Sequence, residues 1–253
     1  MDSSDNQNNW YTKDRSETAS TRMPTRPSLM APDVSVSNPA LGINVYSGAI
    51  TKESGKGYID LLESKLNGQT QFEWNGAHVT TSEEVDLSAR NAKDFKFNSE
   101  GLGPRNEETA ELYDMHESIF RAVKSCVDDY GYHWGVGINA YEAFNFVKYE
   151  GAGTHFRIHA DHGPTYVTTI SIVVYLNDDY EGGDIWFPRM DNLSIKPKAG
   201  DIVVFPSTYI YEHASQDMIS GTKYSVVIMS DYNDRDNVNQ RVPQTVQEYE
   251  LKY

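Results

Sequence analysis

The sequence predicts a mainly β domain, a sandwich or a barrel, preceded by helices. The chain has 253 residues, enough for one large domain with a substantial core. From about residue 134 onward, seven or eight short runs rich in β-branched and aromatic residues are separated by glycine, proline and Asp-Asn turns. Strands at this spacing, without helical patterns between them, indicate a sandwich or barrel rather than alternating β and α units.

The start of the chain differs in composition from the rest. Residues 1–40 are rich in Ser, Asn, Asp, Thr and Pro and have no apolar period. Such a segment buries too little apolar surface to offset the entropy of ordering it, so we expect it to be disordered or loosely attached. The domain is expected over residues 41–253, with its strand-rich core at about 140–232.

Four segments lead into the strand-rich part. Residues 43–50 are expected to form a strand, and residues 51–66 a helix with Thr51 at or near its N-cap. Residues 106–131 repeat apolar side chains at three- and four-residue steps, which places one apolar stripe along a helix. Residues 67–105 show no strong period. Because a long irregular insert in a compact domain is often a binding loop, they are a candidate substrate lid.

Charge and cysteine content narrow the classes of partner. The formal net charge is −15, which disfavours general binding to nucleic acid or to a membrane surface. The one cysteine, Cys126, cannot form an intramolecular disulfide, which suits a reducing compartment. There is no secretory signal pattern and no run of 18 apolar residues. We therefore expect a cytoplasmic protein with no nucleic-acid or membrane partner.

The stretch "GTHFRIHADHG" (153–163) concentrates three histidines and an aspartate. In a strand, alternate residues point to the same side, so His159 and Asp161 share a face at the separation that two ligands of one ion need, whereas His162 points away. His155 has the right parity but lies about 13 Å from His159 along a strand. The cluster therefore reduces to the pair His159-x-Asp161, and His155 and His162 are expected to be solvated or structural.

A pair of ligands leaves a metal underbound, and His213 is the natural third ligand. It follows the turn-bearing strands that would return the chain to the pair. Two histidines and one carboxylate make the facial triad of non-haem Fe(II) oxygenases, which leaves positions open for a co-substrate and dioxygen. Zinc hydrolases also use this ligand set, but commonly from a helical H-E-x-x-H, which is absent here. Lys223, ten residues after His213, could grip the far carboxylate of an anionic co-substrate.

Four stretches in order resemble the 2-oxoglutarate- and Fe(II)-dependent dioxygenases, specifically the prolyl-4-hydroxylase-like group. They are "VKYEGAGTHFRIHAD", "TTISIVVYLNDDYEGGDIWFP", "IKPKAGDIVVFP" and "EHASQDMISGTKYSVVIMSDY". The Y-x-G-x-G-T-x-F-x-x-H-x-D pattern is similar to that of hypoxia-sensing prolyl hydroxylases. Lys223 is more similar to the collagen-type and viral enzymes, which use Lys where the hypoxia sensors use Arg. The resemblance covers roughly residues 140–232, with an extension back to residue 43.

The resemblance implies a fold and a set of site residues. The fold would be a double-stranded β-helix (jelly-roll, cupin-like) with helices packed on the outer sheet. His159, Asp161 and His213 would bind the iron and form the catalytic centre. Lys223 would pair with the C5 carboxylate of 2-oxoglutarate.

Three further residues match co-substrate positions of the family. Tyr149 would line the co-substrate pocket, and Tyr175 could hydrogen-bond the same carboxylate as Lys223. Ser171 stands where the family usually has Thr, and it retains the hydroxyl. Strand tyrosines are otherwise ordinary core residues with a satisfied hydroxyl, so the alternative for both tyrosines is a structural role.

The implied reaction is hydroxylation of an unactivated C–H, in a prolyl or another residue of a peptide. Dioxygen would be consumed and 2-oxoglutarate decarboxylated to succinate, with ascorbate as the reductant that keeps the iron ferrous. Rival substrates are a free amino acid, a small metabolite or a nucleobase. The alternative of another class is a non-catalytic jelly-roll module with a structural or binding role.

Overall fold

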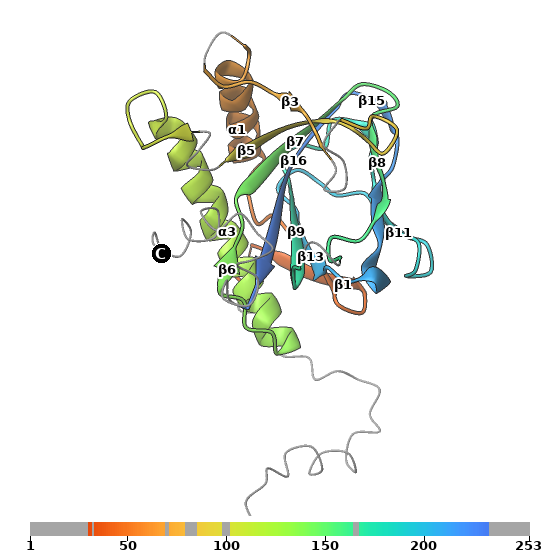
Figure 1. Ribbon diagram of the computed structural model, residues 1–253. Helices are drawn as coiled ribbons and strands as arrows, with labels where there is room; N and C mark the ends of the chain where they lie inside the picture. The colour runs from red at the N-terminus through yellow and green to blue at the C-terminus, as the bar shows by residue number, and fades with distance from the viewer. Residues whose placement is uncertain are drawn as a thin grey trace, which may run out of the picture.

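Two antiparallel sheets and two helices make up most of the molecule. Helices α1 (Lys52–Lys65) and α3 (Ala110–Trp134) stand to one side of the larger sheet, and the smaller sheet lies on the other side (Figure 1). The computed structural model describes residues 30–31, 33–68, 71–78, 85–97, 102–163 and 167–232.

The larger sheet has nine strands, in the order β1-β2-β13-β9-β16-β7-β5-β3, with β6 also paired to β16. Every pair in it is antiparallel. In this order, strands from late in the sequence, such as β13 and β16, lie between strands from earlier in it, such as β2 and β7. The strands are β1 (Ser35–Ala40), β2 (Ile43–Ser47), β3 (Asn75–Gly76), β5 (Lys93–Phe97), β6 (Ala140–Tyr141), β7 (Phe144–Glu150), β9 (Ile170–Tyr175), β13 (Ile202–Pro206) and β16 (Thr222–Asp231).

The smaller sheet has five strands, in the order β12-β11-β14-β8-β4, again with antiparallel pairs. A separate two-stranded ribbon joins β10 (Glu181–Gly182) to β15 (Met218–Ser220). The strands of the smaller sheet are β4 (Arg90–Asn91), β8 (His155–His159), β11 (Ile185–Phe187), β12 (Leu193–Ile195) and β14 (His213–Ser215). A 3-10 turn at Tyr209–Tyr211 precedes β14.

Alternating side chains of the larger sheet supply buried clusters on both of its faces. On the outer face, Ile172 and Val226 belong to one buried cluster with Ile119 and other residues of α3. On the inner face, Val173 belongs to a second cluster with Phe187 of the smaller sheet. The inner face therefore looks toward the smaller sheet, and the outer face carries the helices.

The helices begin and end close to the residues that the sequence indicates. The Thr51 side chain accepts a hydrogen bond from the backbone N–H of Ser54, which makes it the N-cap of α1. Helix α3 ends at Gly135, whose φ of +73° suits a glycine C-cap. Among the described residues, neither these helices nor any other is long and apolar enough to cross a bilayer.

The expectation for residues 1–40 is wrong at its C-terminal end, because Ser35–Ala40 forms strand β1 on the edge of the larger sheet. Most of its side chains are exposed, and it is attached through backbone pairing to β2. An edge strand held in this way needs no apolar period, so composition alone hides it. Residues 1–29 lie outside the described residues.

The segment predicted as an irregular lid, residues 67–105, contributes strands to both sheets. Strands β3 and β5 extend the larger sheet, and β4 pairs with β8 of the smaller sheet. These strands are too short to give a local period. Residues 69–70, 79–84 and 98–101 of the segment lie outside the described residues, so the lid stays a prediction.

We expect Gly200→Ala to lower the free energy of unfolding by roughly 2–4 kcal/mol. Gly200 has a φ of +86°, and a Cβ there would lie 1.8 Å from the carbonyl oxygen of Ile50. The backbone of Gly200 also bonds Ile50 and Tyr175, so it cannot move away without losing those bonds. Urea unfolding measures the change. Gly57→Ala is the matched control, because Gly57 is exposed on α1 with nothing within 4 Å of its Cβ position, and it should gain about 0.5–1 kcal/mol. Equal effects of the two changes would contradict the prediction.

Candidate active site

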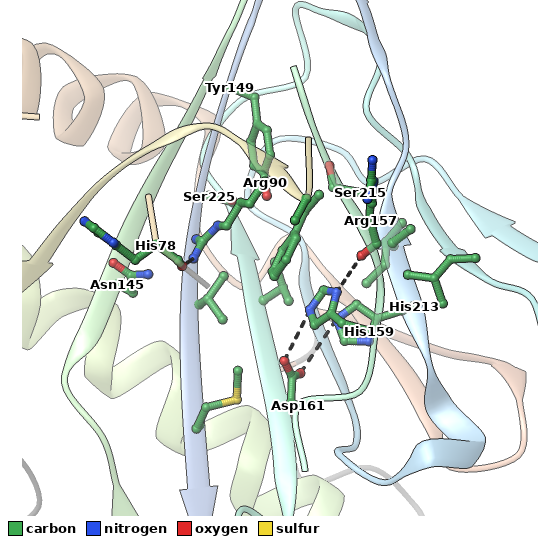
Figure 2. Close-up of a pocket in the computed structure, with 18 of the residues that line it drawn as sticks. His78, Arg90, Asn145, Tyr149, Arg157, His159, Asp161, His213, Ser215 and Ser225 are labelled. Carbon is green, nitrogen blue, oxygen red and sulfur yellow. Dashed lines mark hydrogen bonds and ion pairs between the residues drawn. The ribbon is translucent and has the colours of Figure 1, made fainter. Parts of the chain in front are cut away.

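His159, Asp161 and His213 converge at one end of the space between the sheets. His159 is the last residue of β8, Asp161 comes two residues later, and His213 opens β14 directly opposite His159. One donor atom from each residue lies within 4.8 Å of the others. Asp161 Oδ1 is 3.4 Å from His159 Nε2, and Asp161 Oδ2 is 3.7 Å from His213 Nε2 (Figure 2). The three donors can therefore reach a single ion.

Hydrogen bonds to the Nδ1 atoms of the two histidines fix which ring atoms face inward. The Nδ1–H of His159 donates to the carbonyl oxygen of Arg157 at 2.8 Å, and that of His213 donates to the carbonyl oxygen of Tyr211 at 3.1 Å. Because a carbonyl oxygen only accepts, each Nδ1 carries the proton, and the lone pair of each Nε2 is free for a metal. This second set of contacts orients both imidazoles for coordination.

The ionisation of the trio also suits a cation. Burial raises the pKa of Asp161, but the neighbouring histidines and the hydroxyl of Ser171 outweigh it and hold the pKa below its ordinary value. Burial lowers the pKa of His213 to about 4. At neutral pH the site thus presents an anionic carboxylate and a neutral imidazole, the forms that metals bind.

The donor set fits a ferrous ion. Two imidazoles and one carboxylate would leave coordination positions of the ion for other ligands, and the three side chains line the cavity between the sheets. Among the described residues, this is the one group of three or more His, Cys, Asp or Glu side chains with that convergence.

A cavity of about 770 Å³ adjoins the trio. Strand register explains its wall: Lys223 lies opposite Tyr149, and Ser225 lies opposite Tyr175, so all four belong to the inner face of the larger sheet. Their side chains line the cavity together with the trio. A ligand in the cavity can therefore touch the metal site at one end and the inner sheet at the other.

Lys223 is a buried cation at the inner-sheet end of the cavity. It is 2% exposed, and its Nζ donates to the carbonyl oxygen of Gly183 at 2.7 Å and to the hydroxyl of Ser215. Burial lowers the pKa of Lys223 to about 7, and the charge of Asp184 only partly opposes this. A buried ammonium without a full counter-charge is stabilised by an anionic ligand, so this end of the cavity is suited to a carboxylate.

Of the other expected site residues, some line the cavity and some do not. Tyr149 and Tyr175 are buried, line the cavity, and have pKa values raised by burial, so their hydroxyls stay protonated. Ser171 lies behind the trio instead, where its hydroxyl donates to Asp161 Oδ2 at 2.6 Å and contacts Ser207. His155 and His162 bond backbone carbonyls and stand outside the trio.

Sequence reasoning missed several polar residues of the cavity wall, among them Arg90 and Asn145. Asn145 is on the inner face because it lies four residues before Tyr149 on the same strand, so the alternation in β7 could have found it. Arg90 lies on β4, within the segment that showed no period, and it lines the cavity because β4 pairs with β8. No local signal marks that pairing.

Residues 144–229 match the family model described as "2OG-Fe(II) oxygenase superfamily". No curated protein matches this sequence at a significant level. The matched segment holds the trio, Lys223 and both tyrosines of the cavity.

Solved structures of prolyl hydroxylases are similar in fold. One is a prolyl hydroxylase from Trichoplax adhaerens in complex with a peptide fragment of hypoxia inducible factor (TM-score 0.57, 14% identity, 75% of this chain and 83% of that chain). The viral collagen prolyl hydroxylase of Paramecium bursaria Chlorella virus-1, in complex with 2-oxoglutarate, has a TM-score of 0.53 at 16% identity over 75% and 95% of the chains. A Pseudomonas putida prolyl-4-hydroxylase has a TM-score of 0.52 at 15% identity over 75% and 91%. The antiparallel jelly-roll architecture is thus shared.

Proposed function

We propose that this chain is a 2-oxoglutarate- and Fe(II)-dependent oxygenase of the prolyl-4-hydroxylase-like group, and that it hydroxylates a prolyl or another residue in a peptide; the family-model match and the fold of the prolyl hydroxylases support this. In the overall reaction, one oxygen atom enters the C–H bond of the substrate, the other enters succinate, and 2-oxoglutarate loses CO2. The observation that carries the proposal is the convergence of a His-Asp-His trio and a buried lysine on one cavity.

Each end of the cavity would have its own role in binding. His159, Asp161 and His213 would hold Fe(II), which together with 2-oxoglutarate supplies the oxidising power for C–H hydroxylation. Lys223 would pair with the far carboxylate of 2-oxoglutarate as a charge-assisted hydrogen-bond donor.

The neighbouring residues would orient these groups and keep water out. The protonated hydroxyl of Tyr175 would donate to the co-substrate, Tyr149 would line its pocket, and Ser171 would hold the carboxylate of Asp161 in place. Val173 and Val227, on the inner face, give the cavity an apolar stretch between its two ends. Ascorbate would keep the iron ferrous between turnovers.

A peptide is the substrate class that the comparisons favour. The Trichoplax relative was solved with a peptide, and the viral relative is named for collagen. The net charge of −15 disfavours a nucleic-acid substrate, because it repels the phosphate backbone. A free amino acid or small metabolite is the competing class, since one fold and one iron site serve many substrates.

A non-catalytic module is disfavoured by the cost of the buried charges. The carboxylate side chain of Asp161 is 8% exposed and Lys223 is buried, and desolvating ions costs several kcal/mol each when no ligand compensates them. A non-catalytic scaffold has no ligand to compensate this desolvation free energy, whereas a bound metal and an anionic co-substrate would compensate it.

Incubation with a proline-containing peptide library, Fe(II), 2-oxoglutarate and ascorbate tests the proposal. We expect mass spectrometry to find peptides that gain one oxygen atom, with succinate formed alongside, and no gain when 2-oxoglutarate is omitted. Succinate without any oxidised peptide, together with oxidation of a free amino acid, would reject the peptide substrate. Absence of succinate under all conditions would reject the oxygenase reading.

A further inference from the structure

We propose that Arg90 is a positioning residue that joins the metal end of the cavity to the co-substrate end, through Phe156 on one side and Tyr149 on the other. The inference rests on the proposed function, because it assigns Arg90 a role toward the metal and co-substrate proposed above. Arg90 lies outside the segment that matches the family model. No local pattern in the sequence marks it.

Arg90 is a buried charge that the fold holds firmly in the cavity wall. It is 8% exposed, and its Nη1 donates to the carbonyl oxygen of His78 at 3.1 Å and lies 3.8 Å from Asp94 Oδ2. Asp94 also accepts a hydrogen bond from Asn145 at 3.3 Å. A guanidinium fixed on one edge by these contacts has a defined plane, and its remaining surface can orient other groups.

The first of those groups leads to the metal end. The guanidinium carbon of Arg90 lies 4.8 Å from the centre of the Phe156 ring, its cross-strand partner between β4 and β8. Phe156 in turn stacks on the imidazole of His159, with ring centres 3.7 Å apart and planes 23° apart. The cation therefore holds Phe156 against His159, and Phe156 limits rotation of the imidazole whose Nε2 faces Asp161.

The second group leads to the co-substrate end. Burial raises the pKa of the Tyr149 hydroxyl, and the charge of the neighbouring Arg90 opposes this. Figure 2 shows Arg90 between Tyr149 above and the trio below. Lys223 Nζ lies 4.2 Å from the centre of the Tyr149 ring and donates to Ser215. Arg90 thus fixes the tyrosine that packs against the co-substrate anchor.

Arg90 is distinctive because its two partners belong to different sheets. Phe156 is on β8 of the smaller sheet, and Tyr149 is on β7 of the larger one. A residue that contacts both fixes the spacing between the metal ligands and the carboxylate anchor. A bidentate co-substrate that must reach both ends at once requires that spacing.

The experiment measures two affinities separately under anaerobic conditions, where no turnover occurs. Calorimetry gives the Kd of Fe(II), and then the Kd of 2-oxoglutarate with Fe(II) bound. We expect Arg90→Gln to raise both, each by about tenfold. Phe156→Leu should raise the Fe(II) Kd and leave the 2-oxoglutarate Kd within about twofold, whereas Tyr149→Phe should do the reverse. Arg121→Gln is the matched control on the exposed face of α3 and should change neither.

Two further variants separate positioning from a general loss of structure. In the double variant Arg90→Gln/Tyr149→Phe, the 2-oxoglutarate Kd should equal that of Arg90→Gln alone, because both changes break the same contact. Arg90→Lys should restore Fe(II) affinity, since an ammonium can also sit over Phe156. It should not restore 2-oxoglutarate affinity, because a point charge cannot serve Phe156, His78 and Tyr149 together.

Three results would overturn the inference. The first is that Arg90→Gln leaves both affinities unchanged. The second is that the increases in 2-oxoglutarate Kd caused by Arg90→Gln and Tyr149→Phe multiply in the double variant. The third is that Phe156→Leu and Tyr149→Phe each weaken both affinities equally. The last pair of variants keeps the test decisive if Arg90→Gln fails to fold. Failure of the wild type to bind Fe(II) or 2-oxoglutarate would instead reject the proposed function.

Discussion

Asp161→Ala is expected to weaken Fe(II) binding by more than about 100-fold and to abolish succinate release. The carboxylate is the one anion of the trio and lies between the two imidazoles, 3.4 Å from His159 Nε2 and 3.7 Å from His213 Nε2. Without it, two neutral nitrogens remain, and their affinity for a hard cation is low. Anaerobic calorimetry with Fe(II) and a succinate assay with 2-oxoglutarate and ascorbate measure the two effects.

Controls separate the loss of a ligand from a loss of folding. Asp60→Ala removes an exposed aspartate of α1 and should leave both measurements unchanged. Ser171→Ala keeps the ligand but removes the 2.6 Å hydrogen bond that orients it, so it should cause an intermediate loss of about 10- to 100-fold in Fe(II) affinity. Succinate release by Asp161→Ala at the wild-type rate would contradict the assignment of the metal site.

Lys223→Met is expected to raise the Kd of 2-oxoglutarate by roughly 30- to 1000-fold, which corresponds to about 2–4 kcal/mol, with little change in the Kd of Fe(II). Methionine fills a similar volume but has no charge to offer the far carboxylate. Anaerobic titrations of the two ligands measure the contrast. Lys56→Met, on the exposed face of α1, is the matched control. An unchanged 2-oxoglutarate titration would remove Lys223 from the co-substrate site.

Because the pKa of Lys223 is lowered, the affinity for 2-oxoglutarate should depend on pH. Burial lowers the pKa of the free side chain to about 7, and a bound carboxylate would raise it, so binding takes up a proton above pH 7. The 2-oxoglutarate affinity of the wild type should therefore be constant below about pH 7 and fall as pH rises above it. The Lys223→Met variant should lack this dependence.

Stability should respond to pH in the opposite sense. An unfolded lysine titrates near 10.5, so between about pH 7 and pH 10.5 the unfolded state binds more protons than the folded state. This group's contribution to the free energy of unfolding therefore rises with pH across that window. In urea unfolding, the Lys223→Met variant should gain most over the wild type at or below pH 7, and the gain should shrink toward pH 10.5.

The location of the trio could be predicted from the sequence in part. Strand parity paired His159 with Asp161 and set His162 apart, whereas His155 was set apart by its distance along the strand; the structure brings His159 and Asp161 together with His213. However, β8 ends at His159, so Asp161 comes near through the turn that follows the strand rather than through strand alternation. The choice of His213 depended on the chain returning, and the pairing of β14 with β8 supplies that return.

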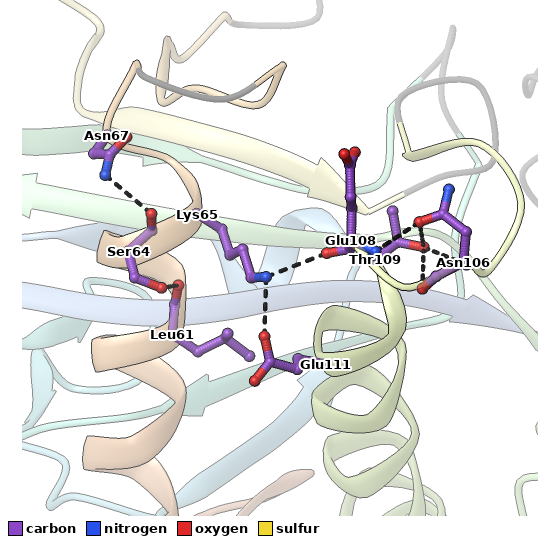
Figure 3. Close-up of polar contacts among 8 residues, drawn as sticks. All are labelled: Leu61, Ser64, Lys65, Asn67, Asn106, Glu108, Thr109 and Glu111. Atoms are coloured by element: carbon purple, nitrogen blue, oxygen red, sulfur yellow. Dashed lines mark hydrogen bonds and ion pairs between the residues drawn. The ribbon is translucent and has the colours of Figure 1, made fainter.

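Helix boundaries show what a periodic pattern leaves out. The apolar stripe suggested a helix from residue 106, but α3 begins at Ala110. The side chain of Asn106 accepts hydrogen bonds from the backbone N–H groups of Glu108 and Thr109, and Lys65 of α1 bonds the Glu108 carbonyl and pairs with Glu111 (Figure 3). Asn106 thus holds the chain in a turn before the helix, a preference that a count of apolar positions does not detect.

Arg90 could not be predicted from the sequence for a different reason. It acquires its place through pairing with a strand 66 positions away, Phe156 opposite Arg90. The register of such non-local pairs is set by the whole packed arrangement, and two-residue strands carry no period of their own.

Ser171 and Asp161 form a bridge between layers that has a thermodynamic consequence. Ser171 belongs to the larger sheet, and the aspartate that it supports stands beside the two histidines of the smaller one. An ion clasped by that aspartate and those histidines would fasten one layer to the other. Its binding free energy would then add to the stability of the whole sandwich. Iron depletion in a cell would therefore lower the protein's resistance to unfolding as well as its activity.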